Sequence, residues 1–330
     1  MSLKWTSGRK RRTPNSSVHA DEPVRVFNVA RSLAAHRLSS FVSRHRCSGR
    51  TVMLVAAFVA TASSSAMTID LKPLWNFDDP AESEQRFRAR LSTASPDDAF
   101  ILQTQIARSY GLRRDFDTAR EILQGLEPKL ANVSVEARTR YWLELGRSYS
   151  SATHPPESQT ADARGRAREG YERALQTAKS GGLDDLAIDS LHMLAFVDTA
   201  PADQLKWGKA ALSMAEASSH PLAKAWEPSL RNNVGYALYQ LGRFDEALDQ
   251  FQQAVVLRER GNDIEATRIA HWMVAWTLRA MSRTDDALNI QLRLEVERAA
   301  AGVPSTYVFD ELEILYRAKA MRSVLPTTPQ

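Results

Sequence analysis

The chain of 330 residues contains a single cysteine, Cys47, which excludes a disulfide framework and a cysteine-based zinc site. Glycine and proline are also scarce, at 14 each, or about 8% of the chain together, against a usual ~12%. A β-sandwich needs a turn about every ten residues, so this scarcity favours long helices. The hydrophobic content of 43% is sufficient for a sizeable core and excludes a chain that is disordered throughout.

Sequence motifs of catalysis and of metal or cofactor binding are missing as well. None of the seven histidines stands four residues from another, so the two-histidine zinc motif of a helix is absent. There is no Gly-x-Ser-x-Gly motif, no phosphate-binding loop and no dinucleotide-binding glycine triplet. We therefore expect a protein that is not an enzyme and that uses no catalytic residue, metal or cofactor.

The net charge of +4 is divided unevenly along the chain. Residues 1–50 contain eleven Lys or Arg and two acidic residues, for a charge of +9, which leaves −5 for residues 51–330. The basic character of the chain therefore belongs to its first 50 residues. The rest is mildly acidic and gives no electrostatic reason to expect nucleic acid as a partner.

Residues 1–66 are predicted to be an unpacked leader, rich in Arg and Ser and without a sustained apolar period before residue 52. Within it, residues 52–66 resemble the core of a signal peptide, with about eleven apolar residues followed by small ones. Such a run is too short for a stable membrane span, which needs ~20 residues.

Three interpretations of the leader stay open. A true start between residues 40 and 50 makes segment 52–66 an export signal and the protein periplasmic or otherwise exported. A true start at Met67 makes the protein cytoplasmic. The Arg and Ser bias also fits an organellar transit peptide, although Asp21 and Glu22 count against it. The localisation therefore depends on where translation begins.

Similar segments recur through the rest of the chain. Trp142, Leu145, Gly146 and Tyr149 follow the spacing of the first-helix signature of the tetratricopeptide repeat. A second segment resembles the latter part of that repeat at Gly235, Leu238, Leu241, Gly242, Phe244, Ala247, Phe251 and Ala254. The resemblance implies paired helices with Gly242 in the turn between them, and with Ala247 and Phe251 packed between the pair.

Weaker copies bring the number of repeats to about five. A small residue opens the second helix of each copy, at Ala119, Ala167, Gly208, Ala247 and Ala287. These residues are 48, 41, 39 and 40 positions apart, against a usual period of ~34, so the chain resembles the longer-helix variants of the family. The resemblance implies an all-α, right-handed solenoid of helical hairpins over residues 95–300.

Segments at the two ends are expected to close the solenoid, because an uncapped stack exposes its apolar face. Residues 67–94 are predicted to contain a short helix that begins at Pro80. The apolar residues before it are expected to cover the first pair of helices: Leu71, Leu74, Trp75 and Phe77. Residues 301–330 are predicted to form a capping helix and tail, with apolar positions at Phe309, Leu312, Ile314, Leu315 and Tyr316.

The spacing of 48 residues between Ala119 and Ala167, the longest of the four, has a local cause. About nine extra residues fall within 150–160, a polar segment that contains Pro155 and Pro156. Because the segment carries no repeat position and closure entropy rises slowly with loop length, shortening it is expected to cost little stability.

In the resembled family, the first helix of each pair lines a concave groove that holds a partner's peptide. The matching positions here are Arg108, Arg147, Asn232, Tyr236, Tyr239, Trp272, Trp276 and Arg279, with Thr104, Leu143, His192 and Phe196 beside them. Arg108 and Arg147 are expected to offer paired donors to a carboxylate, and the aromatic residues to contact the ligand. The alternative is that Trp272 and Trp276 are packed between helices.

The resemblance implies a non-catalytic scaffold or adaptor that binds a protein or peptide partner in this groove. Two other functions stay open: an enzyme that uses the groove as a pocket without a known motif, and a structural or oligomerisation module of an envelope assembly. Nucleic acid is not expected as a partner.

Overall fold

The computed structural model describes residues 69–303 and 305–324, and every regular element within these ranges is a helix. The predicted leader 1–66 and its signal-like segment 52–66 lie outside the described residues. The longer helices are α2 Pro80–Leu91, α3 Pro96–Leu112, α4 Phe116–Leu126, α5 Val135–Tyr149, α6 Ala161–Ser180, α7 Asp184–Val197, α8 Pro201–Ala217, α10 Glu227–Gln240, α11 Phe244–Glu259, α12 Ile264–Ala280, α13 Thr284–Ala300 and α14 Thr306–Val324. The short ones are η2 Lys72–Leu74, η3 Glu127–Asn132, η4 Pro156–Ser158 and α9 Pro221–Lys224. None of these helices has the length and apolarity that crossing a membrane requires.

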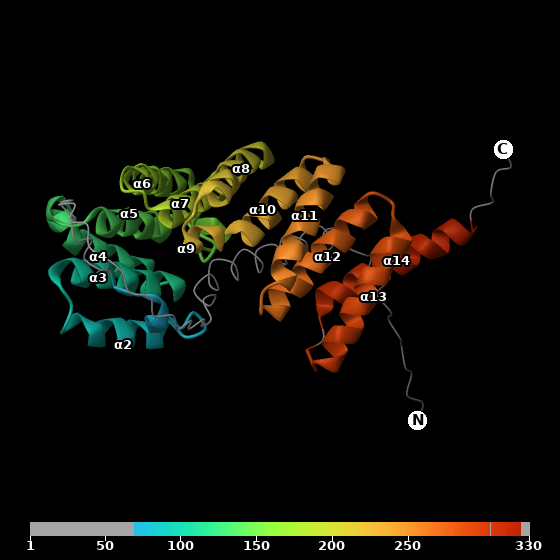
Figure 1. The fold of residues 1–330 in the computed structure, drawn as a ribbon, viewed down its shortest axis with the longest axis horizontal. Helices are drawn as coiled ribbons and strands as arrows, with labels where there is room; N and C mark the ends of the chain where they lie inside the picture. The colour runs from blue at the N-terminus through green and yellow to red at the C-terminus, as the bar shows by residue number, and fades with distance from the viewer. Residues whose placement is uncertain (1–68, 304, 325–330) are drawn as a thin grey trace, which may run out of the picture.

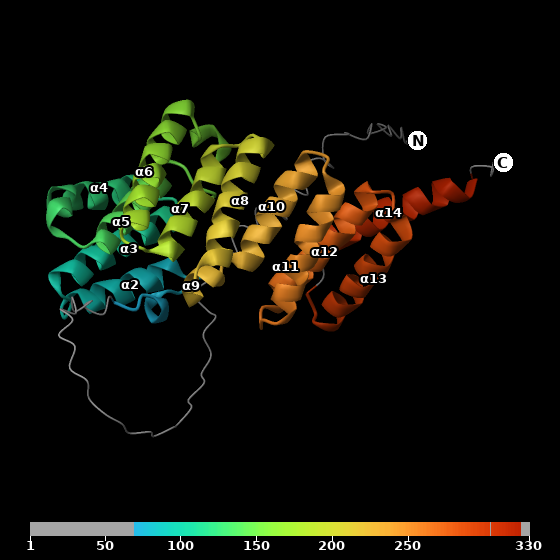
Figure 2. The same ribbon diagram turned by 45° about the horizontal axis from the view of Figure 1, so that its top comes forward.

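Within the described part of the chain, ten helices form five consecutive hairpins: α3 with α4, α5 with α6, α7 with α8, α10 with α11, and α12 with α13. The hairpins follow one another along the long axis of the molecule, from α2 at one end to α14 at the other (Figure 1, Figure 2). The second helix of each hairpin packs against the first helix of the next. The all-α hairpin solenoid predicted from the repeats is confirmed.

Two helices begin directly after a residue whose side chain caps the first turn. The side chains of Asp79 and Ser95 accept backbone N–H bonds of 3.0 to 3.1 Å from the first turns of α2 and α3. Pro80 and Pro96 are the first residues of these helices. A proline is tolerated there because the N–H that it lacks would have no partner inside the helix.

Three of the five hairpin turns contain a residue with a left-handed backbone. Gly242, which is predicted to make the turn between α10 and α11, has a φ of +73°. Arg114 and Ser282 adopt φ values of +66° and +62° between the helices of the first and fifth hairpins. Because positive φ is unfavourable for a residue with a Cβ atom, hairpin packing rather than local preference sets these two turns.

Small residues are buried where helices pack closely, either within a hairpin or, at Gly208, against Val234 of the next hairpin. The predicted small positions are all buried, at Ala119, Ala167, Gly208, Ala247 and Ala287. Another such contact joins α5 to α6 at Gly146 and Gly170. An added Cβ on Gly146 would lie 2.6 Å from the ring of Tyr171 and 3.0 Å from the carbonyl oxygen of Ala167. Glycine is the residue that leaves room for this contact.

The N-terminal end of the solenoid is covered by the residues that precede α3. Leu71 is buried, and Trp75 lies edge-on to Phe87 of α2 with ring centroids 4.9 Å apart. Trp75 also donates through Nε1 to Oε1 of Gln105 on α3 at 3.3 Å. These contacts place the predicted apolar lead-in against the first hairpin.

The C-terminal end is covered by α14, as predicted. Leu312 and Leu315 are buried, and the helix packs against α13. Phe309 and Tyr316 are about half exposed, at 47% and 51%. Only part of the predicted apolar set therefore faces the core.

The segment 150–160 lies between α5 and α6, as predicted, but it is well packed. His154 is buried, and its ring stacks on Phe116 of α4 with centroids 3.6 Å apart. Gln159 donates to the carbonyl oxygens of Ser151 and His154 at 3.3 and 3.4 Å. This packing counts against the expectation that the segment can be shortened at little cost, since a loop that packs by its own side chains leaves no trace in the repeat pattern.

We expect Gly146→Ala to destabilise the protein by about 1–3 kcal/mol, the usual cost of overpacking a core. The Tyr171 ring cannot move aside freely, because its hydroxyl donates to the carbonyl oxygen of Ser150 at 2.5 Å. Gly165→Ala on α6 is the matched control, since its added Cβ would meet nothing within 4 Å, and it should stabilise by up to ~1 kcal/mol. Urea unfolding measures both changes, and equal effects would contradict the close approach.

Gln291 on α13 is fully buried, and neither polar atom of its amide has a hydrogen-bond partner within the described residues. A buried polar group without a partner costs roughly 1–3 kcal/mol. Gln291→Met keeps the length of the side chain and removes both polar atoms, so it should raise the free energy of unfolding by about 1–2 kcal/mol. Chemical denaturation tests this, and a loss of stability would show that the amide is hydrogen-bonded in solution.

Candidate functional site

The first helices of successive hairpins, together with α14, are joined side chain to side chain along one side of the solenoid, which we call the first-helix face. The predicted groove residues all lie on these helices: Arg108 on α3, Arg147 on α5, Asn232, Tyr236 and Tyr239 on α10, and Trp272, Trp276 and Arg279 on α12. They form two groups, the two arginines toward one end of the face and the remaining residues toward the other.

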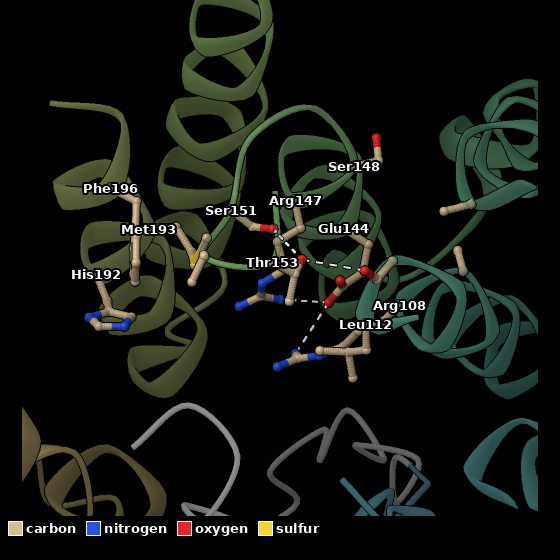
Figure 3. A pocket seen from close by; sticks show the side chains of 14 residues that line it. Arg108, Leu112, Glu144, Arg147, Ser148, Ser151, Thr153, His192, Met193 and Phe196 are labelled. Carbon is tan, nitrogen blue, oxygen red and sulfur yellow. Dashed lines mark hydrogen bonds and ion pairs between the residues drawn. The ribbon is translucent and has the colours of Figure 1, made fainter. Parts of the chain in front are cut away.

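Arg108 and Arg147 belong to a chain of four charges that links α3, α5 and α7, and Figure 3 shows its first three members. Arg147 donates to Oε1 of Glu144 at 2.6 Å and to both carboxylate oxygens of Asp189 at 2.5 and 2.6 Å. Arg108 donates to the same oxygen of Glu144 at 3.4 Å. The two positive charges are therefore balanced by two negative ones.

The four side chains are largely buried, from 3% exposure for Glu144 to 16% for Arg108. Burial lowers the pKa of Arg108, and the positive charge of Arg147 lowers it further. Burial alone would lower the pKa of Arg147 and raise that of Asp189. Their mutual attraction outweighs burial, so that the pKa of Arg147 is raised and that of Asp189 is lowered. Each of these two groups thus holds the other in its charged form.

A pocket opens beside this ion-pair chain (Figure 3). The empty space of the hollow, about 640 Å³, includes open solvent, and the part comparable to a cavity volume is about 70 Å³. Its walls come from α3, α4, α5, α7 and the 150–160 segment. Half of the lining residues are small or apolar: Ala107, Gly111, Leu112, Ala119, Ala152, Met193 and Phe196. Because the guanidinium groups in the lining already donate to carboxylates, the surface left for a ligand is mainly apolar.

The 150–160 segment supplies one wall of the pocket through Ser151, Ala152 and Thr153. The hydroxyl of Thr153 donates to the carbonyl oxygen of Gly111 on α3 at 3.3 Å, which ties this wall to a neighbouring helix. The backbone N–H of His154 donates to the carbonyl oxygen of Ser151 at 3.1 Å and closes a turn. The pocket has this wall because the inserted segment folds back on the first-helix face.

The aromatic residues of the second group stack on one another. The rings of Tyr239 and Trp276 lie 3.4 Å apart, and Trp276 also stacks with Tyr236 and Trp272 at 6.0 and 5.8 Å. Tyr236, Trp272 and Trp276 are buried, whereas Tyr239 is partly exposed. The geometry favours packing between helices as the role of the two tryptophans.

Arg279 and Asn232 complete the second group. Arg279 makes a two-pronged ion pair with Glu311 of α14, at 2.7 and 2.9 Å. Asn232 is partly buried, and the adjacent Asn233 contacts Nδ1 of His192 on α7 at 3.1 Å. Side-chain contacts between neighbouring first helices thus continue from α3 to α14.

Glu144, Asp189 and Met193 are site residues that the repeat pattern does not indicate. Glu144 stands three residues before Arg147, a helical spacing typical of an ion pair, and this signal could have identified it. Asp189 stands 42 residues after Arg147. No spacing in the sequence indicates that contact, because it depends on how α5 and α7 are placed against each other.

The pocket offers shape and apolar surface to a ligand. The hydroxyl groups in its lining are engaged, that of Ser148 with the carbonyl oxygen of Leu145 at 2.7 Å and that of Ser151 with Nδ1 of His154 at 3.0 Å. Over the ranges that the structure describes, no group of three His, Cys, Asp or Glu side chains is placed to hold a metal ion. The arrangement is suited to binding an apolar group.

Removing Arg147 alone would leave the carboxylates of Glu144 and Asp189 buried without their main partner. We expect Arg147→Met to lower the free energy of unfolding by about 3–5 kcal/mol. Arg317→Met is the matched control, because it removes an exposed ion pair with Glu313 and should cost under ~1 kcal/mol. Urea unfolding near neutral pH compares the two variants.

The pH dependence of this loss has a definite sign. In the wild type, the lowered pKa of Asp189 contributes stability above its ordinary value of ~3.9, and this is lost as the pH falls through the lowered value. Without Arg147 the buried carboxylate favours its proton, so the deficit of Arg147→Met should shrink as the pH falls. A deficit that is unchanged between neutral and acidic pH would contradict the ion-pair chain.

Comparison with known proteins bears on the origin of the hairpins. Residues 226–294 match the sequence profile described as Tetratricopeptide repeat, and no curated protein matches the chain. Three solved structures are similar. BtubC (BKLC) from P. vanneervenii is 14% identical, with 79% of this chain and 96% of that chain covered and a TM-score of 0.49. A putative kinesin light chain from Podospora anserina with TPR-like repeats is 16% identical, with coverages of 60% and 94% and a TM-score of 0.47, and the apo form of the quorum sensor NprR from B. thuringiensis is 14% identical, with coverages of 72% and 76% and a TM-score of 0.39. Within residues 226–294, which hold α10, α11, α12 and the first part of α13, the sequence matches the tetratricopeptide repeat, as the residues around Gly242 and Ala247 indicate.

Proposed function

We propose that this chain is a non-catalytic scaffold that binds a peptide segment of a protein partner on the first-helix face, with one apolar side chain of that segment in the pocket. Its family supports the general class, because tetratricopeptide repeats are as a rule interaction scaffolds and not enzymes. The observation that carries the proposal is the pocket between α3, α5 and α7, an apolar hollow on the face that the first helices form.

The ligand group is apolar because the charges around the pocket are already paired. Arg108 and Arg147 donate to carboxylates of the chain itself. A ligand carboxylate would have to displace these partners and lose its own hydration, which makes its burial expensive. An apolar side chain displaces no ion pair, and it gains about 25 cal/mol for each Å² removed from water. The charge balance therefore favours a neutral anchor.

The size of the pocket agrees with this role. Its cavity volume of about 70 Å³ lies below the usual 300–1,000 Å³ of small-molecule pockets, so it has room for one small side chain and not for a larger ligand. The scaffold of the proposal is the hairpin array of residues 95–300, closed by residues 67–94 and 301–330. Asn232 and the partly exposed Tyr239 extend the contact along the first-helix face.

Filling the pocket from inside tests the proposal. Gly111 lines the pocket, and a Cβ added to it meets nothing within 4 Å, so Gly111→Phe places a ring there without a backbone clash. Peptides selected from a display library against the wild-type chain should bind this variant with a free energy weaker by about 2 kcal/mol or more, or roughly 30-fold in Kd. Fluorescence anisotropy with the labelled peptides measures the change.

Gly165→Phe is the matched control. It lies on α6 outside the pocket lining, and its added Cβ also meets nothing within 4 Å. The control should bind the selected peptides as the wild type does. Equal binding by Gly111→Phe would place the peptide elsewhere on the protein, and a failure to select any peptide would contradict the scaffold itself.

A further inference from the structure

The wall formed by the 150–160 segment has no counterpart in the other four described hairpins. Their helices are joined by three residues, at 113–115, 198–200, 241–243 and 281–283, whereas eleven residues join α5 to α6. The long connection reaches the pocket lining with Ser151, Ala152 and Thr153. What holds this segment in place therefore decides whether the pocket is enclosed.

His154 holds the segment, and its hydrogen bonds define its protonation. The backbone N–H of Ser151 donates to Nδ1 of His154 at 3.1 Å, so Nδ1 must carry a lone pair. The proton of the neutral ring is then on Nε2, which donates to the carbonyl oxygen of Ser148 at 3.2 Å. The neutral imidazole thus joins the end of α5 to the first turn of the inserted segment.

The surroundings of His154 disfavour a positive charge. The ring is 7% exposed and stacks on Phe116. Of the charged groups on α4, Arg120 faces the same carbonyl oxygen of Ser148, to which it donates at 2.7 Å, and its own partner Asp117 is 90% exposed. The other groups that contact the ring are neutral: the carbonyl oxygen of Ser148 on α5, and the backbone N–H and hydroxyl of Ser151 in the segment itself. Among the described residues no carboxylate pairs with the ring.

A proton added to Nδ1 breaks this arrangement at one defined point. Nδ1–H would then face the backbone N–H of Ser151, which places two donors against each other. The Ser151 hydroxyl, 3.0 Å from Nδ1, can turn to accept the new proton, but the backbone N–H has lost its acceptor. The added charge also lies close to the guanidinium of Arg120. The protonated ring is therefore stable only when the turn at Ser151 opens.

We propose that the 150–160 segment is a pH-operated wall of the pocket, closed while His154 is neutral and opened when His154 is protonated. The inference rests on the proposed function, since it assigns to that binding site a loss of affinity in mildly acidic conditions. The consequence for a ligand is direct, because opening removes Ser151, Ala152 and Thr153 from the pocket lining.

The direction of the pKa shift agrees with the geometry. Burial, together with the charge of Arg120, lowers the pKa of His154 below its usual value, although the bond to Ser148 partly offsets this. A lowered histidine pKa means that the open state binds more protons than the closed one. Closure is therefore fully favoured above the usual pKa of ~6.5 and is lost as the pH falls below it.

Amide hydrogen exchange of the full chain tests the wall without any ligand. On going from near neutral pH to about pH 5, we expect exchange within residues 150–160, corrected for its intrinsic pH dependence, to rise severalfold, because the open state binds the added proton more tightly than the closed one. His154→Asn should abolish this response, because its side-chain oxygen can accept from Ser151 but does not titrate. His271→Asn on α12 is the matched control and should leave the response unchanged.

Two outcomes would overturn the proposal: equal protection of the segment at both pH values, or a response that persists in His154→Asn. An NMR titration of the His154 ring provides a second measurement, and its pKa must coincide with the midpoint of opening. A labelled peptide selected near neutral pH should bind the wild type more weakly near pH 5, in proportion to the fraction of open segment at that pH, whereas His154→Asn should bind it equally at both pH values. If the segment opens at low pH but the affinity for the peptide does not change, the proposed regulation is refuted and the proposed scaffold function is not. If the segment opens but no peptide binds the protein at any pH, the scaffold function is refuted.

Discussion

Each first helix of this solenoid is covered by the hairpin that follows it, so a charged side chain on the covered side must find its partner inside the protein. A buried charge without a partner costs several kcal/mol. Arg147 meets this requirement through Glu144 on its own helix and Asp189 on the next. Arg279 meets it at the other end through Glu311 of α14. The stacking of the hairpins therefore decides where the charges of the first-helix face can lie.

The same requirement shapes the pocket. With the arginines held by internal carboxylates, the surface offered to a ligand is that of Leu112, Met193, Phe196 and the wall formed by residues 150–160. That wall depends on a buried imidazole and not on the repeat packing that holds the rest of the solenoid together. The binding surface and the part of it that responds to pH are thus stabilised by separate interactions.

Most of the fold could be predicted from the sequence, because its signals act over short distances. Gly242 marks a hairpin turn, Ala247 a close helix contact, and Ser95 the start of a helix. The pocket could not be predicted, since the contact between Arg147 and Asp189 depends on the placement of two helices. Helical spacing put Trp276 on one face of α12, but it could not show whether that face is covered, because aromatic residues are common in cores and at interfaces alike.

The central claim is that an apolar side chain of a partner peptide lies in the pocket beside Met193. Intermolecular nuclear Overhauser effects between a bound, library-selected peptide and methyl-labelled methionines of the protein test it most directly. The account predicts contacts from an apolar side chain of the peptide to the methyl group of Met193, which lines the pocket, and none to Met281 at the far end of the solenoid. Contacts to Met281 with an unperturbed Met193 would contradict it.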